Sequence, residues 1–132
     1  MFESGSAFIV IVAADPGQRG RCREAIDKYG FRVSGAGSLV EAFAVLEQRP
    51  TDAPRPSLFV CVGMGSDGAQ AAVKELRRHP WTAPAHILIV DETLTPEQSL
   101  ALIDAGVSDC YCKPFLAPMF SARVRGALRS GG

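Results

Sequence analysis

The sequence predicts an α/β fold with a parallel sheet, and two patterns support this class. Short apolar runs recur along the chain, and FIVIV at residues 8–12, LFVCV at 58–62 and ILIV at 87–90 contain no polar residue. Strands that are apolar on both faces are typical of a parallel sheet covered by helices. Segments of helical periodicity separate these runs, so that strand and helix alternate five times. Right-handed crossovers then place helices on both faces of the sheet.

Capping residues mark where several of the helices begin. Asp15 and Thr95 each precede a proline, which is the order of an N-cap followed by a proline in the first turn. Ser38 and Glu41 have the spacing of a capping box. The predicted strands cover residues 8–12, 31–33, 58–62, 87–90 and 109–112, and the predicted helices cover residues 16–29, 39–48, 69–79, 96–105 and 118–129.

Length and composition indicate one globular domain. The chain has 132 residues, of which 47% are hydrophobic and 21% charged, and a chain of this size can bury a full core. Its 14 basic residues balance its 14 acidic ones, so no global field favours nucleic acid or a membrane surface. We find neither a membrane-spanning run nor a signal peptide, and therefore expect a cytoplasmic location. The core of the domain should cover residues 8–129, with flexible tails at 1–6 and 130–132.

The chain has four cysteines, Cys22, Cys61, Cys110 and Cys112. Nothing in the sequence indicates an oxidising compartment, so disulfides are not expected. Cys110 and Cys112 place two sulfur atoms on one face of a strand, but no second Cys/His pair completes a zinc site. We therefore predict buried, reduced thiols, and no metal ion or other cofactor.

One loop is longer than an ordinary connection between secondary-structure elements. Residues 49–57, RPTDAPRPS, contain three prolines and separate the second predicted helix from the third predicted strand. This loop is either a surface insertion or a segment that contacts a partner, and we favour the insertion.

Several short motifs give the chain a resemblance to a known family, the receiver domains of bacterial two-component response regulators. The resemblance covers nearly all of residues 8–129. It implies a flavodoxin-like, doubly wound five-stranded parallel sheet with strand order 2-1-3-4-5 and five helices. The motifs are the apolar strand leading into Asp15-Pro16, Asp67-Gly68 after the third strand, Ala105-Gly106 before the fifth strand, and Lys113-Pro114-Phe115 after it.

The resemblance also implies a chemistry, which this sequence lacks the residues to perform. Members of the family transfer a phosphoryl group to an aspartate at the end of the third strand, with Mg²⁺ held by an acidic pair at the end of the first. Here the acidic pair falls on Ala13 and Ala14, followed by Asp15, and the acceptor position falls on Val62. The position of a phosphoryl-binding serine or threonine falls on Asp91, and the family lysine is retained as Lys113. We therefore predict a degenerate receiver, or pseudo-receiver, that is not an enzyme.

Three local features follow from the same resemblance. Asp91 either forms an ion pair with Lys113 that fills the vacated site, or merely caps the turn that follows it. The peptide bond before Pro114 is expected to be cis, as the family keeps it. The family's switch aromatic falls on Cys110, and Tyr111, one residue later, should point to the other face of the sheet.

We expect a phosphorylation-independent signalling module that acts through protein–protein contacts in a two-component-type pathway. Its partner would be a signalling protein, namely a kinase, an output domain or another regulator, and neither nucleic acid nor a membrane is expected. The resemblance implies that the contact surface is the fourth helix, fifth strand and fifth helix, which would also serve a homodimer. Candidate residues on this surface are Tyr111, Arg123 and Arg125, although a solvated face explains the arginines equally simply.

Two alternative functions stay open at this point. The first is the binding of a small anionic ligand, such as a cyclic dinucleotide, because arginine side chains suit phosphate groups. The second is phosphorylation at a non-standard carboxylate, Asp67 or Asp15. The arginines available for the first function are Arg19, Arg21, Arg23 and Arg32.

Overall fold

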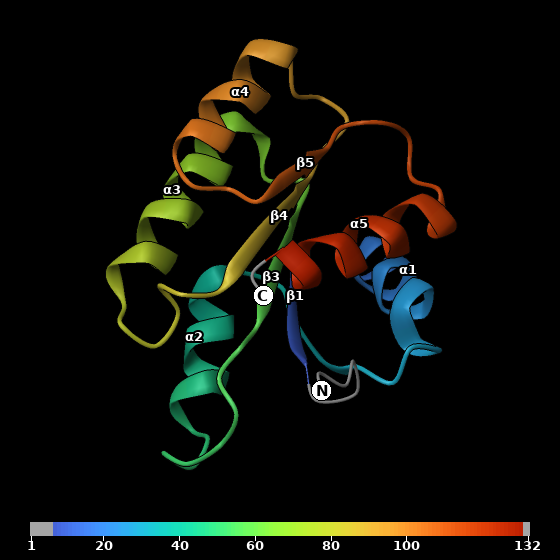
Figure 1. Ribbon diagram of the computed structural model, residues 1–132. Helices are drawn as coiled ribbons and strands as arrows, with labels where there is room; N and C mark the ends of the chain where they lie inside the picture. Colours follow the sequence, from blue (N-terminus) through green and yellow to red (C-terminus); the bar gives the residue numbers. More distant parts are fainter. Residues whose placement is uncertain (1–6, 131–132) are drawn as a thin grey trace.

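The computed structural model describes residues 7–130 and has a five-stranded sheet, with all neighbouring strands parallel, in the order β2-β1-β3-β4-β5 (Figure 1). The strands are β1 (Phe8–Ala13), β2 (Arg32–Ala36), β3 (Leu58–Val62), β4 (His86–Val90) and β5 (Asp109–Tyr111). The helices are α1 (Pro16–Asp27), α2 (Leu39–Glu47), α3 (Gly65–Arg78), α4 (Pro96–Asp104) and α5 (Ala117–Ser130). The predicted flavodoxin-like topology is confirmed.

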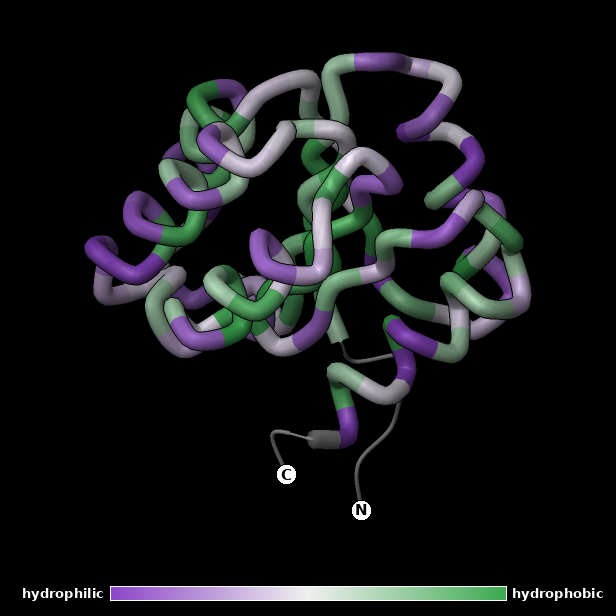
Figure 2. The backbone as a smooth tube through the Cα atoms, turned by 90° about the horizontal axis from the view of Figure 1, so that it is seen from above, coloured by the Kyte–Doolittle hydropathy of each residue, from purple (hydrophilic) through white to green (hydrophobic). Residues whose placement is uncertain are grey.

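The sheet separates two hydrophobic cores. Helices α1 and α5 cover one face, and α2, α3 and α4 cover the other (Figure 1). Along β1, Val10 and Val12 face the core under α2, α3 and α4, while Ile9 and Ile11 face the core under α1 and α5. This alternation explains why the central strands are apolar throughout. Seen from above, the hydrophobic strands lie in the middle of the molecule, between more polar helices (Figure 2).

The predicted caps start three of the helices. The Asp15 carboxylate accepts a hydrogen bond from the Gly17 N–H at 3.1 Å, and the Ser38 hydroxyl accepts one from the Glu41 N–H at 3.1 Å. Thr95 forms a complete capping box with Gln98. The Glu41 carboxylate differs from the expected box, because it accepts from the Gly37 N–H, one residue before the cap. These local contacts account for the agreement between predicted and observed helix starts.

Some boundaries differ from the sequence-based prediction. Helix α1 ends at Asp27, two residues early, and the chain then turns through Gly30, whose φ is +77°. Helix α3 begins at Gly65, four residues before the predicted start, and both Gly63 in the preceding loop and Gly65 have positive φ. Positive φ is costly for residues with a Cβ atom. Helix α5 extends to Ser130, where a tail was predicted, and the other predicted tail residues, 1–6 and 131–132, lie outside the described part.

The prediction of a cis peptide before Pro114 is wrong, because none of the peptide bonds within residues 7–130 is cis. The Tyr111 hydroxyl donates to the Pro114 carbonyl at 3.1 Å and accepts from the Leu116 N–H at 3.0 Å. These bonds hold the turn after β5 with the ordinary trans geometry, which most X–Pro bonds adopt. In the described residues, no helix combines the length and the apolar character needed to cross a membrane.

Candidate functional site

The carboxyl edge of the sheet carries a cavity of about 530 Å³. Val62, Asp91 and Lys113, three of the positions that the resemblance singles out, line it together with Gln18 and Arg21. The ends of β3 and β4, the residues after β5 and one side of α1 therefore meet around this cavity. Open parallel sheets place their functional sites at this edge.

The end of β1 offers no acidic pair. Ala13 is fully buried, and its carbonyl accepts a hydrogen bond from Arg19 Nη1 of α1 at 2.7 Å. Ala14 is exposed, and the Asp15 carboxylate is used as the cap of α1. A metal ion such as Mg²⁺ needs oxygen ligands, whereas these positions present two methyl groups and a guanidinium. Within residues 7–130 no group of three or more His, Cys, Asp or Glu side chains could hold a metal ion.

Val62 lies at the end of β3 and is 6% exposed. It is paired with Ala13 of β1 and Val90 of β4, so the floor of the site is hydrocarbon. Asp67, the first carboxylate after Val62 in the sequence, is an exposed residue in the first turn of α3. A valine side chain has no atom that could accept a phosphoryl group.

Asp91 is the buried charge of the site. Its Oδ2 accepts from the Gly65 N–H at 2.7 Å, and its Oδ1 accepts from the Thr93 N–H at 2.9 Å and the Thr93 hydroxyl at 2.6 Å. Burial acts to raise the pKa of Asp91, but the hydrogen bonds from Thr93 and Gly65 outweigh it and hold that pKa below its ordinary value. The ionised carboxylate therefore joins the end of β4 to the first residue of α3.

The alternative in which Asp91 forms an ion pair with Lys113 is wrong. Within residues 7–130, the ion pairs shorter than 4.0 Å are Arg78–Glu75, His79–Glu75 and Arg123–Asp109. Both Asp91 oxygens already have closer donors, and the exposed Lys113 ammonium gains little from leaving water. The hydrogen bonds from Thr93 agree with the other alternative, in which Asp91 caps the turn that follows it. The bond to Gly65 was not predicted, because 26 residues separate the two positions in sequence.

Tyr111 and Cys110 point to opposite faces of the sheet, as predicted. The Tyr111 ring is 1% exposed and packs in the core under α1 and α5, while Cys110 packs against the core on the other face. Tyr111 therefore cannot belong to a contact surface, and that part of the predicted surface is wrong. Only the resemblance implied that Tyr111 lies on this surface, and the short strand Asp109–Tyr111 has too few residues for its own pattern to show which side chains are covered.

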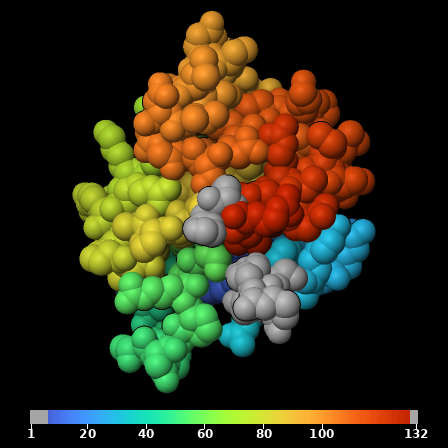
Figure 3. All heavy atoms as spheres, viewed as in Figure 1, coloured from blue at the N-terminus to red at the C-terminus, as the bar shows by residue number. Residues whose placement is uncertain are grey.

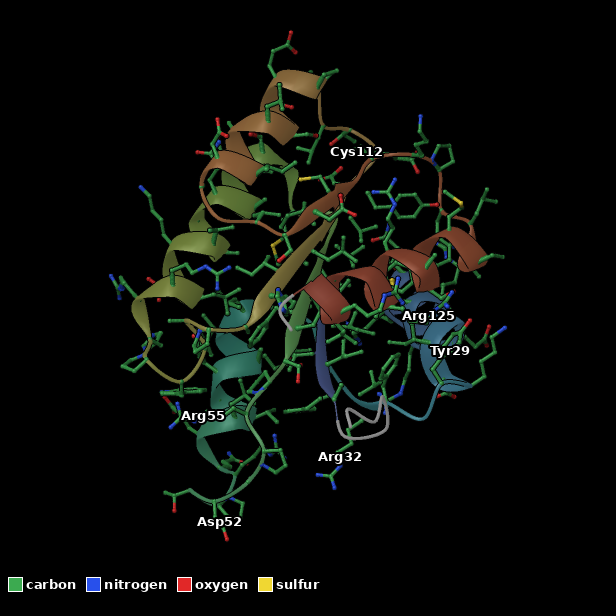
Figure 4. The ribbon with its side chains drawn as sticks, in the orientation of Figure 1. Tyr29, Arg32, Asp52, Arg55, Cys112 and Arg125 are labelled. Atoms are coloured by element: carbon green, nitrogen blue, oxygen red, sulfur yellow. The ribbon has the colours of Figure 1, made fainter. Side chains whose placement is uncertain are left out.

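The two predicted surface arginines have partners within the chain. Arg123 Nη1 lies 2.8 Å from Asp109 Oδ2, in an ion pair whose side chains are about one-third exposed. Arg125 donates to the Ser121 carbonyl at 3.2 Å and lies 4.7 Å from the centre of the Tyr29 ring (Figure 4). Both side chains therefore hold α5 against its neighbours, and only part of each is open to solvent.

The arginines of the alternative anion site do not converge. Arg19 and Arg23 donate to the carbonyls of Ala13 and Val33, at 2.7 and 2.9 Å, and so tie α1 to the end of β1 and to the start of β2. Arg21 lies 6.0 Å from the Phe115 ring, beside the cavity at the carboxyl edge. Arg32 is exposed at the first residue of β2, at the opposite edge. One ligand could not contact all four side chains.

The four cysteines are free thiols, but only Cys22 and Cys61 are buried as predicted, whereas Cys110 and Cys112 are half-buried. Burial raises the pKa of Cys22 to about 11 and that of Cys61 to about 12. Burial is also the largest cause of the raised pKa of Cys110, about 11. The thiolate is the reactive form of cysteine, and these values leave very little of it at neutral pH.

The chain is similar to known proteins in structure, although its sequence alone gives no match. No family model matches the sequence, and the search of curated proteins gave no match. A response regulator from Thermotoga maritima superposes with a TM-score of 0.78 and 18% identity, over 93% of this chain and 98% of that one. One from Desulfuromonas acetoxidans gives a TM-score of 0.75 and 22% identity, over 94% and 98%.

A probable two-component system response regulator/GGDEF domain protein also matches, with a TM-score of 0.79 and 22% identity. The match covers 97% of this chain but only 51% of that protein, so the similar region is about half of it. The fold is thus that of response-regulator receiver domains. At identities of 18–22% the likeness establishes the fold, and a fold alone does not fix an activity.

Proposed function

We propose that this chain is a phosphorylation-independent receiver domain, a pseudo-receiver, which signals through protein–protein contacts. The observation that carries the proposal is the Asp91 carboxylate, which bonds to Gly65 and Thr93 in the cavity that the hydrocarbon side chain of Val62 also lines. A negative group that is part of the chain already bridges the loops after β3 and β4. The domain thus needs no phosphoryl group to join them.

The contact surface that we propose is formed by α4, β5 and α5. These segments, coloured orange to red, form one continuous face in Figure 3. Large apolar side chains are exposed in two pairs, one on α4 and one around the start of α5, and the members of each pair are three residues apart. Exposed apolar side chains that are neighbours are typical of interaction sites. The members of the two pairs are Leu100 (62% exposed), Ile103 (44%), Leu116 (60%) and Met119 (43%). The partner would be a kinase, an output domain, another regulator or a second copy of the chain.

Phosphoryl transfer is the direct test of the first half of the proposal. The purified chain is incubated with acetyl phosphate and Mg²⁺, beside a conventional receiver domain, and the intact masses are measured. We expect the mass of this chain to stay unchanged while the control gains one phosphoryl group. A phosphoryl adduct mapped to Asp67 or Asp15 would instead support non-standard phosphorylation and contradict the proposal.

The contact surface is tested by capture of partners from the source cells. Val40 on α2 is 81% exposed and gives a matched control for the apolar residues of α4. A chain with Leu100→Asp and Ile103→Asp should lose a protein that both the original chain and Val40→Asp retain. Loss with Val40→Asp alone would place the surface on α2 and contradict the proposal.

A further inference from the structure

A second cavity, of about 360 Å³, lies far from Asp91. It is lined by the end of α2, the proline-rich loop at residues 49–57, and the connection from α3 to β4. These segments lead into β3 and β4, so the cavity is at the amino edge of the sheet. Its volume is within the range of small-molecule sites. The proposed function makes no use of it.

One wall of this cavity is aromatic. Trp81 and His79 line it, and Phe43 supports both rings from behind. The Phe43 and Trp81 rings meet edge to face, with centres 5.5 Å apart and planes at 88°, and the His79 ring centre is 4.7 Å from that of Phe43. Trp81 and His79 are half-buried, so part of each ring remains open to a ligand. A partly open indole suits a planar ring.

The proline-rich loop adds two arginines to the lining. Arg49 is held in place, because its Nη1 donates to the Pro54 carbonyl at 3.1 Å and its guanidinium lies 4.3 Å from the centre of the Phe8 ring. A guanidinium has five N–H donors, so most of those of Arg49 remain available. Arg55 is exposed and makes no hydrogen bond or ion pair with any residue from 7 to 130.

The acidic groups near the cavity are few. Glu47, at the end of α2, is the acidic residue in the lining. Asp52 lies at the tip of the loop and points away from the sheet (Figure 4), and it does not line the cavity. Glu75 lies 3.7 Å from His79 Nε2 and also pairs with Arg78, and it too is outside the lining. The lining thus contains two guanidinium groups and one carboxylate, and this excess of positive charge favours a ligand with negative charge.

We propose that this cavity binds a small anionic ligand with a planar ring, of the nucleoside monophosphate class. The ring would lie against Trp81, and the phosphate would accept hydrogen bonds from Arg55 and Arg49, whose planar groups match phosphate oxygens. The site explains why this loop is long and why it carries an arginine without an internal partner. It is independent of the carboxyl edge, so its failure would leave the proposed function unaffected.

The test uses Trp81, which is the chain's one tryptophan. Trp81 lines the cavity at the amino edge, so its fluorescence reports on ligand binding at this site. Adenosine and guanosine monophosphates are titrated into the full chain to about 1 mM, with adenosine and guanosine as ligands that lack the phosphate. The same titrations are made with Arg55→Ala and with the matched control Arg32→Ala. Figure 4 shows Arg32 away from α2, and it is also exposed and outside the cavity lining.

We expect a saturable change in Trp81 fluorescence with at least one of the two nucleotides. Arg55→Ala should weaken this binding by about tenfold or more, as loss of a charge-assisted contact does. Arg32→Ala should leave it unchanged, and the nucleosides should bind at least about tenfold more weakly than the nucleotides. Three results would overturn the proposal: no saturable change with either nucleotide, equal affinity for nucleosides, or equal weakening by both variants. Unfolding temperatures of the two variants, measured without ligand, verify that both are folded.

Discussion

Asp91 is the residue on which the geometry of the carboxyl edge depends. Its two oxygens accept three hydrogen bonds, from one backbone N–H of α3 and from two groups of Thr93. The residue is 7% exposed, so an ionised side chain is retained there only because these donors replace water. A carboxylate beside the first residue of α3 also interacts favourably with the positive end of that helix.

Replacement of Asp91 by alanine should destabilise the chain by about 2 kcal/mol, because it leaves the Gly65 N–H and the Thr93 groups without their charged acceptor. Chemical unfolding in urea measures this change. The control is Glu92→Ala, an exposed neighbour, whose effect should stay within about 0.5 kcal/mol. Equal effects of the two substitutions would refute the assigned role of Asp91.

The stabilisation by Asp91 should also depend on pH. Its folded-state pKa is depressed, so the unfolded chain binds the proton more readily. The contribution is therefore fully present above the unfolded pKa, about 3.9, and is lost as pH falls through the folded value. The difference in unfolding free energy between the original chain and Asp91→Ala should shrink between pH 7 and pH 3. A difference that stayed constant over this range would show that ionisation of Asp91 contributes nothing.

At the scale of elements, Arg77 of α3 connects three segments. Its Nη1 donates to the carbonyls of Ala83 and Ala85, and its Nη2 donates to the Gly106 carbonyl at 2.8 Å. These carbonyls belong to the connection before β4 and to the turn after α4. One side chain thus fixes α3 relative to the connection before β4 and to the turn after α4.

Substitution of Arg77 by methionine should lower the unfolding free energy by about 2 kcal/mol, because the aliphatic length is kept while three carbonyls lose a charged donor. Arg78→Met is the matched control on the same helix. Its side chain is 71% exposed and its ion pair with Glu75 is at the surface, so it should change stability by less than about 0.5 kcal/mol. Urea unfolding of both variants measures the difference, and a comparable loss in Arg78→Met would argue against Arg77 as a specific tether.

The starts of the helices show which features of the fold could be predicted from the sequence. Helices α1, α2 and α4 begin where predicted, because a residue within three positions satisfies the first N–H groups. Helix α3 begins earlier than predicted, since its first N–H bonds to Asp91, 26 residues away. Local patterns contain no information about such a contact.

At the scale of the whole molecule, the order of the strands was predicted correctly, because the resemblance to receiver domains implies one complete topology. The positions of Val62, Asp91 and Lys113 around one cavity follow from that topology. The hydrogen-bond partners of Asp91 could not be predicted from the topology, because they depend on which donors lie within 3 Å of each carboxylate oxygen. The aromatic and arginine-lined cavity at the amino edge was also missed, because helix α2, the loop and the α3–β4 connection meet only in the folded chain.

We expect the carboxyl edge of the sheet to keep a single conformation, because the chain itself supplies the Asp91 carboxylate that joins Gly65 to Thr93. Beryllofluoride with Mg²⁺ imitates a phosphoryl group on a receiver aspartate, so it provides the most direct test of this claim. Backbone amide NMR spectra of the chain, recorded with and without it, should be unchanged at Gly65 and Thr93 and elsewhere. Shifts of these amides with saturable dependence on beryllofluoride would contradict the account, since they would reveal an acceptor carboxylate at this edge.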